Sequence, residues 1–159
     1  MKLKILYILL LITSQFIVGQ NRIITGRVLT EELIPIPKLQ IQTIDTLLLA
    51  ETDFEGRFSI TVTKETEKLL LSWIGMEWTT IQLLNDCDNL EIITMTHVIY
   101  DFIPNRKVDK LRLKRFKMLP KLRKKALEKG LFVNEKLCYK QDFVASKPEL
   151  DRIKKSRIK

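Results

Sequence analysis

Few side chains in this sequence could carry covalent or metal chemistry. His97 is the one histidine, and Cys87 and Cys138 are the two cysteines. A thiolate beside an imidazole base is a nucleophile, so either cysteine paired with His97 would form a catalytic dyad. A peptidase zinc site needs about three protein ligands, commonly two histidines and a carboxylate. Neither cysteine lies in an activating motif, and one histidine is too few for such a zinc site, so we expect no catalytic residue, no metal and no cofactor. We interpret His97 as an exposed residue at a strand end.

The acidic turn that begins at Asp53 resembles part of a calcium loop only superficially. An EF-type loop needs a carboxylate at its twelfth position, and Lys64 stands there when the count begins at Asp53. Asp53 can instead accept hydrogen bonds from the downstream backbone, and Gly56 can adopt a positive φ. Phe58 then begins an alternating strand. The segment therefore predicts a β-hairpin.

Short segments of this kind, separated by turn residues, fill the first two thirds of the chain and predict an antiparallel β-sandwich. The continuous apolar run from Leu69 to Leu71 predicts a central strand that is covered on both faces. We expect seven strands, at residues 23–29, 39–43, 46–51, 57–62, 68–74, 78–84 and 90–95.

Four motifs occur in order: Gly26-Arg27-Val28, Pro35-Ile36-Pro37, Thr52-Asp53-Phe54-Glu55-Gly56-Arg57-Phe58 and Ser72-Trp73-Ile74-Gly75-Met76. Together they resemble the carboxypeptidase regulatory-like domain of exported bacterial proteins. The resemblance covers roughly residues 22–96 and implies a mainly β, immunoglobulin-like or transthyretin-like sandwich with a noncatalytic role. The positions that carry the fold motif are Gly26, Pro37, Asp53, Gly56, Phe58 and Gly75.

The sequence departs from the family pattern at three places. Lys38 stands where a glycine usually follows the second proline, and residues 30–33 stand where a glycine-bearing turn is usual. Met76 replaces an aromatic residue. We expect these departures to alter one loop and leave the sandwich intact.

The N-terminus has the features of a signal peptide at residues 1–19. Lys2 and Lys4 precede an apolar run over residues 5–18, and the small residue Gly19 follows it. As a helix, this run would cover about 21 Å, less than the roughly 30 Å of a bilayer core. We expect cleavage after Gly19 or Gln20 and export to the periplasm, to the outer membrane or into the medium.

Charge divides the remaining chain. Residues 20–104 carry 6 basic and 13 acidic side chains, whereas residues 105–159 carry 20 and 6. We assign residues 20–97 to the sandwich and residues 98–159 to a basic, largely helical extension with a frayed end. Pro120 should begin a second helix that stops at Gly130. The expected apolar stripe comprises Val108, Leu111, Met118, Leu119, Leu122 and Ala126.

Three features of the chain leave alternatives open. The apolar stripe docks on the sandwich or a partner, or it lies on an anionic membrane surface. The basic side chains available for such a surface are Lys110, Lys114, Lys117, Lys121, Arg123 and Lys124. Cys87 and Cys138 form a disulfide that ties the extension to the sandwich, or remain thiols. Trp73 and Trp78 stack on a sugar ring, or pack within the protein.

These observations favour a noncatalytic, exported binding or assembly module of the Gram-negative cell envelope with a protein partner. The alternative is a module that binds a glycan or an anionic membrane surface, and an enzyme that depends on cysteine and histidine is the weakest candidate. We expect no nucleic-acid partner, because no recognition motif is present and an exported protein seldom meets nucleic acid.

Overall fold

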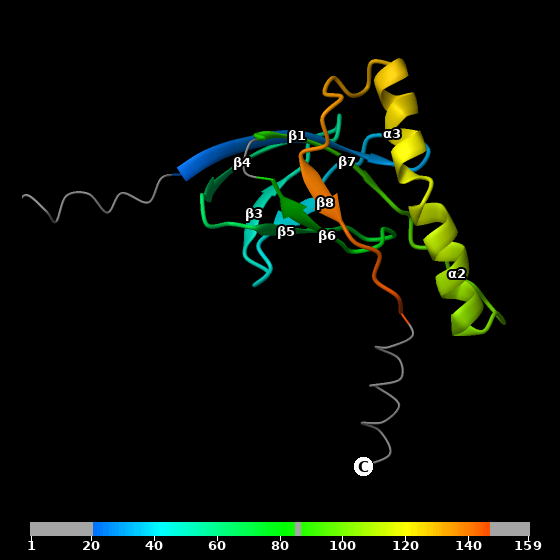
Figure 1. Cartoon of the computed structure of the whole chain (residues 1–159). Coiled ribbons are helices and arrows are strands. Elements are labelled where there is room, and N and C mark those ends of the chain that lie inside the picture. The colour runs from blue at the N-terminus through cyan, green and yellow to red at the C-terminus, as the bar shows by residue number, and fades with distance from the viewer. Residues whose placement is uncertain (1–20, 85–86, 147–159) are drawn as a thin grey trace, which may run out of the picture.

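The computed structural model describes residues 21–84 and 87–146, and Figure 1 shows their arrangement. The expected signal peptide and the expected frayed end from residue 151 lie outside the described residues. No helix in the described part of the chain is long and apolar enough to cross a bilayer. The strands are β1 (Asn21–Thr30), β2 (Gln40–Gln42), β3 (Leu48–Glu51), β4 (Arg57–Thr63), β5 (Lys68–Ser72), β6 (Thr79–Leu83), β7 (Asn89–Thr94) and β8 (Tyr139–Gln141), and the helices are α2 (Asn105–Phe116) and α3 (Leu119–Glu128).

The fold is mainly β, with one sheet of three strands and one of five. The sheet orders are β4-β1-β7 and β3-β2-β5-β6-β8. Each of the seven expected ranges contains a strand, but the expected count of seven is wrong because the basic extension contributes β8. The expectation that all strands are antiparallel is also wrong. β7 follows β6 of the other sheet and pairs with β1 in parallel, Val28 opposite Ile92.

The two sheets share one apolar core, which strand alternation builds. In β4, every second residue is buried, so Phe58, Ile60 and Val62 face inward. The opposing sheet contributes Ile41, Leu69, Leu71 and Ile81, among others. β5 is the middle strand of its sheet, as expected for the run from Leu69 to Leu71. Leu70 is only half-buried, however, so the expected cover on both faces is wrong for this strand.

β7 is instead the strand that is buried on both faces. Five consecutive residues, from Leu90 to Thr94, are buried. Leu90 and Ile92 face the core between the sheets, whereas Ile93 belongs to a second apolar cluster with Leu29, Ala126 and Phe132. The helical extension therefore covers the outer face of the three-stranded sheet, on the side where Figure 1 shows α3.

The turn at Asp53 forms as the sequence predicts, but the predicted β-hairpin is wrong, because β3 and β4 on either side of the turn belong to different sheets. The Asp53 carboxylate accepts hydrogen bonds from the backbone N–H groups of Glu55 and Arg57, at 2.9 and 2.8 Å. Gly56 has φ +73°, and a Cβ atom there would lie 2.4 Å from the carbonyl oxygen of Val28. A Cβ atom at Gly26 would lie 2.2 Å from the carbonyl oxygen of Leu90, because β7 pairs closely with β1 at this point. Neither position can therefore hold a side chain unless the neighbouring backbone moves.

The departures at Lys38 and Leu33 retain the backbone that a glycine would adopt. Lys38 has φ 55° and Leu33 has φ 64°, both in the left-handed region. The Lys38 N–H also donates to the carbonyl oxygen of Thr52 at 2.8 Å, which holds the turn in place. Both residues therefore hold a strained backbone conformation.

The second helix, α3, begins and ends within about two residues of the positions that the sequence predicts. α2 and α3 are separated at Lys117 and Met118, and Pro120 lies in the first turn of α3. Gly130, with φ +68°, follows the end of α3. Figure 1 shows α2 and α3 following one another along one side of the sheets.

The extension returns to the sheets through β8. Leu83 of β6 lies opposite Tyr139 of β8, and a disulfide joins Cys138 to Cys87 with Cα atoms 5.3 Å apart. In the chain-entropy model, a loop of 51 residues closed in this way stabilises the fold by about 4 kcal/mol. The extension is therefore hydrogen-bonded and covalently linked to the sandwich.

We expect Lys38→Gly to increase the free energy of unfolding. A left-handed conformation costs a residue with a Cβ atom about 1–2 kcal/mol, and the added freedom of glycine in the unfolded chain offsets about 0.4–1 kcal/mol of that gain. The net increase should be about 0.5–1 kcal/mol, measured by urea unfolding. Lys38→Ala is the matched control, because it removes the same exposed side chain and keeps the Cβ atom. An equal gain in both variants would contradict the strain.

We expect Tyr139 to make stability depend on pH above about 10. Burial raises the pKa of Tyr139 to about 12, whereas the unfolded phenol has a pKa of about 10. The stability from the neutral phenol is therefore present below pH 10 and is lost as the pH rises toward 12. Between pH 9 and pH 11 the wild-type protein should lose about 1 kcal/mol more than Tyr139→Phe, measured by urea unfolding at each pH. Parallel profiles would show that the phenol has the same pKa in the folded and unfolded states.

Candidate functional site

Three arginines of the helical extension contact carboxylates of the sandwich. Arg112 and Arg115 lie on α2 and Arg123 lies on α3, and they pair with Glu77, Glu31 and Glu91 respectively. The three arginine side chains are between 12% and 23% exposed. The sequence does not reveal these pairs. Their partners are 32 to 84 residues apart in the chain, and contacts at such separations leave no local spacing pattern.

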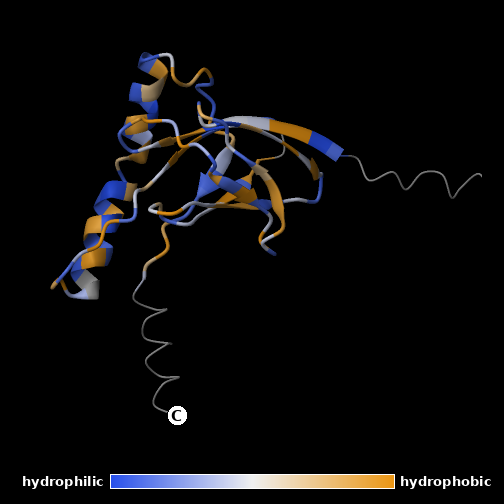
Figure 2. Cartoon of the chain, turned by 180° about the vertical axis from the view of Figure 1, so that it is seen from behind, coloured by the Kyte–Doolittle hydropathy of each residue, from blue (hydrophilic) through white to orange (hydrophobic). Residues whose placement is uncertain are grey.

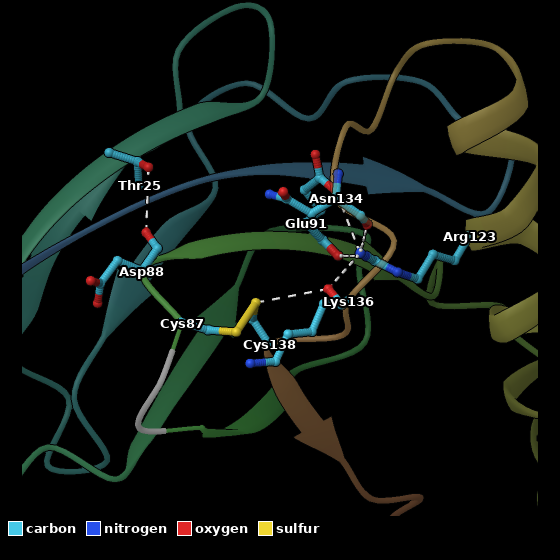
Figure 3. Close-up of a disulfide and its surroundings, with 8 residues drawn as sticks. All are labelled: Thr25, Cys87, Asp88, Glu91, Arg123, Asn134, Lys136 and Cys138. Carbon is cyan, nitrogen blue, oxygen red and sulfur yellow. Dashed lines mark hydrogen bonds and ion pairs between the residues drawn. A yellow bond between two sulfur atoms is a disulfide. The ribbon is translucent and has the colours of Figure 1, made fainter.

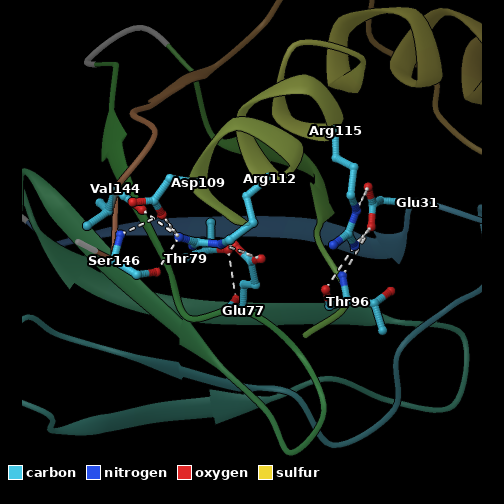
Figure 4. Close-up of polar contacts among 9 residues, drawn as sticks. All are labelled: Glu31, Glu77, Thr79, Thr96, Asp109, Arg112, Arg115, Val144 and Ser146. Carbon is cyan, nitrogen blue, oxygen red and sulfur yellow. Dashed lines mark hydrogen bonds and ion pairs between the residues drawn. The ribbon is translucent and has the colours of Figure 1, made fainter. Parts of the chain in front are cut away.

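Arg112 is the most completely paired of the three (Figure 4). Its Nε and Nη2 atoms donate to the two carboxylate oxygens of Glu77 at 2.9 and 2.8 Å. Nη1 donates to Asp109, to the backbone oxygen of Val144 and to the hydroxyl of Ser146. The hydrogen bond to Glu77 raises the pKa of Arg112 above its ordinary value. One guanidinium thereby joins α2, the loop before β6 and the segment after β8.

Arg115 lies one turn further along α2 and contacts the turn after β1 (Figure 4). It pairs with both carboxylate oxygens of Glu31 and donates to the backbone oxygen of Thr96 at 2.8 Å. Glu31 in turn accepts from the N–H of Thr96 at 3.2 Å. This pair fixes the segment after β7 against α2.

The prediction that Arg123 is among the side chains available to a surface is wrong. Its side chain is 12% exposed, and its guanidinium donates at 2.6 Å to the backbone oxygens of Glu91 and of Asn134. It also lies 5.3 Å from the ring centroid of Phe132. Figure 3 shows it directed at Glu91, whose carboxylate accepts from the backbone of Val133 and Asn134. Glu91 was detectable in the sequence as a carboxylate inside an apolar strand.

The lysines of the same helices differ from the arginines. Lys110, Lys114, Lys117, Lys121 and Lys124 are exposed. Among the residues that the structure describes, none of these five forms a salt bridge. Their ammonium groups are therefore exposed to solvent, whereas the arginines hold the helices in place.

A cavity with a volume of about 700 Å³ lies between the sandwich and α2. The turn between β5 and β6 supplies one wall, the residues after β7 a second, and α2 with residues 144–146 a third. Trp78 and Ile74 are 73% and 89% exposed, whereas Trp73 is half-buried and packs against the core. The lining residues are Trp73, Ile74, Gly75, Met76, Glu77, Trp78, His97, Val98, Val108, Arg112, Val144, Ala145 and Ser146.

The polar groups at this cavity are largely paired with each other. Glu77, Arg112 and Ser146 form the hydrogen-bonded set described above. His97 is exposed, as expected, and its backbone N–H donates to the carbonyl oxygen of Gly75 at 2.8 Å. The cavity is thus mostly apolar, with a rigid polar base.

The structure leaves no thiol for a dyad with His97, because both cysteines are in the disulfide. Within the described residues, no group of three histidine, cysteine, aspartate or glutamate side chains could hold a metal ion. The fold-motif residues Gly26, Asp53, Gly56 and Phe58 lie in strands and turns, and their observed contacts are structural. Gly75 differs, because it lies in the wall of the cavity.

We expect Arg112→Met to destabilise the protein by about 2–3 kcal/mol, because it leaves the Glu77 carboxylate without its ion-pair partner. Arg57→Met is the matched control. Arg57 forms a salt bridge with Glu55 in which both side chains are 62% exposed, so its loss should cost less than about 1 kcal/mol. Urea unfolding of both variants measures the difference. Equal losses would show that the Arg112 network does not hold α2.

The chain matches no protein-family model and no curated protein. The resemblance to the carboxypeptidase regulatory-like domain therefore rests on the four sequence motifs and on the two-sheet fold that contains them. The cavity, the paired arginines and the exposed lysines are the features of this chain that bear on function.

Proposed function

We propose that the protein is a noncatalytic, exported binding module of the Gram-negative cell envelope that holds an apolar segment of a partner protein in the cavity beside Trp78. On this proposal, the two sheets are a carboxypeptidase regulatory-like sandwich of the transthyretin-like kind. The observation that carries the proposal is the cavity of about 700 Å³ with Trp78 and Ile74 exposed at its wall.

The chemistry of the lining favours apolar side chains over a sugar. A saccharide is oriented by hydrogen bonds to its hydroxyl groups, and a site for it needs polar side chains that can make new bonds. Here the guanidinium of Arg112 already donates to Glu77, Asp109, Val144 and Ser146. Ile74, Met76, Val98 and Val108 supply surface that gains from the exclusion of water.

The exposed aromatic ring supports a protein partner specifically. Tryptophan is enriched among the residues that contribute most to protein interfaces, particularly beside a pocket. Trp78 is 73% exposed in a described segment whose neighbour Thr79 is 4% exposed and begins β6. The backbone of Trp78 is therefore anchored by the strand that begins at the next residue, which lowers the entropy lost when a partner binds.

The disulfide and the leading segment support export. Disulfides persist in the periplasm and outside the cell, where the environment is oxidising. Residues 1–19 have the charge and apolar pattern of a signal peptide. Together they favour the cell envelope as the place where this module meets its partner.

The test is site-specific photo-crosslinking in intact cells, with the photoreactive residue at position 78. We expect one protein adduct, and mass spectrometry should place the crosslink in an apolar segment of that partner. The same photoreactive residue at position 54 is the matched control. Phe54 is 86% exposed, but it lies in the Asp53 turn and does not line the cavity. An identical adduct from both positions would contradict the proposal.

A second variant tests the cavity itself. Ile74→Ser should abolish the adduct at position 78, because it removes an exposed apolar contact without changing the core. Ile23→Ser, at a side chain 63% exposed on β1, should preserve it. The same measurement is made on a chain that ends at Ser146. This truncation keeps Ser146, which borders the cavity, and removes the residues that follow it in the sequence. Binding of envelope polysaccharide that survives Ile74→Ser would favour the glycan alternative.

A further inference from the structure

A second exposed surface lies where the segment after β7 meets the first turns of α2. It forms a groove of about 450 Å³ lined by Phe102, Ile103, Pro104, Lys107, Lys110, Leu111 and Lys114, which we call the α2 patch. The α2 patch shares no lining residue with the Trp78 cavity. In Figure 1, this end of α2 extends beyond the sheets.

The apolar part of the α2 patch is exposed to solvent. Phe102 is fully exposed, and Leu111 and Ile103 are 40% and 36% exposed. Phe102 also has φ 59°, a conformation that is rare for a large side chain and costs free energy. A fully exposed aromatic ring gains free energy when it moves from water into an apolar phase.

The charged part of the α2 patch surrounds these side chains. Lys107, Leu111 and Lys114 are spaced i, i+4 and i+7 and share one helical face, with Lys110 beside them. In the described part of the chain, none of the three lysines forms a salt bridge. The one acidic residue of α2, Asp109, contacts Arg112 at 3.2 Å. Figure 2 shows hydrophobic and hydrophilic residues side by side along this helix.

We propose that the α2 patch binds an anionic lipid surface. Phe102 and Ile103 enter the interface between headgroups and acyl chains, and the three lysines contact lipid phosphates. The two kinds of side chain suit the two layers of a bilayer surface. The fully exposed ring of Phe102 can enter the acyl layer, and the flexible lysine stems let the ammonium groups reach the headgroups. An acidic protein would satisfy the lysines without providing an apolar layer for Phe102.

The test is co-sedimentation of the mature protein with vesicles of phosphatidylcholine, with and without phosphatidylglycerol. We expect partitioning at least tenfold stronger on the anionic vesicles, decreasing as salt is added, because each lysine near such a surface contributes about fivefold. Equal partitioning on both vesicles would overturn the proposal. Complete competition by soluble polyglutamate would overturn it too, in favour of an acidic protein partner.

Two matched pairs of variants separate charge from insertion. Lys107→Gln/Lys110→Gln/Lys114→Gln should reduce partitioning at least tenfold, whereas Lys121→Gln/Lys124→Gln/Lys125→Gln on α3 removes the same charge and should preserve most of it. Phe102→Ser should reduce partitioning about tenfold, whereas Phe54→Ser should not change it. All altered side chains are exposed, and urea unfolding confirms that each variant folds. Equal losses within either pair would overturn the proposal.

Discussion

The outer face of the three-stranded sheet needs a cover, and the rest of the structure depends on how it is supplied. Leu29 and Ile93 would contact water if α3 and the segment after it did not place Ala126 and Phe132 over them. Apolar contact alone does not orient a helix, because it is not directional. The pairs of Arg112, Arg115 and Arg123 with glutamates provide the direction, since a planar guanidinium matches a carboxylate in one geometry. The cavity beside Trp78 exists because α2 is held at that position.

α2 serves two surfaces because its faces are chemically different. Val108, Arg112 and Arg115 follow one face toward the sandwich, and Lys107, Leu111 and Lys114 follow an adjacent face toward solvent. Arginine is suited to the inner face because it makes several fixed hydrogen bonds, whereas lysine keeps its charge hydrated on a flexible stem. The Trp78 cavity and the α2 patch are therefore built on one helix in fixed relative orientation.

The parts of the fold with a local cause could be predicted from the sequence. Alternation gave the strand at Phe58, the Asp53 carboxylate explained its turn, and Pro120 marked the start of α3. The parts that failed have a tertiary cause. β8 has three residues and forms only because β6 offers a free edge, and β7 runs parallel to β1 because of the order in which the chain changes sheets. Arg123 was indistinguishable from a surface lysine until Glu91 was placed opposite it.

The five-stranded sheet closes late along the chain, because its last strand is β8. The β6 edge is completed by residues 139–141, so this sheet cannot be finished until nearly the whole described chain is present. Such a high sequence separation slows folding, because the entropy of closing a long loop is lost before the contact forms. The disulfide has a similar separation, because it joins Cys87 to Cys138, the residue directly before β8. Completion of the β6 edge and formation of the disulfide therefore depend on the same late segment of the chain.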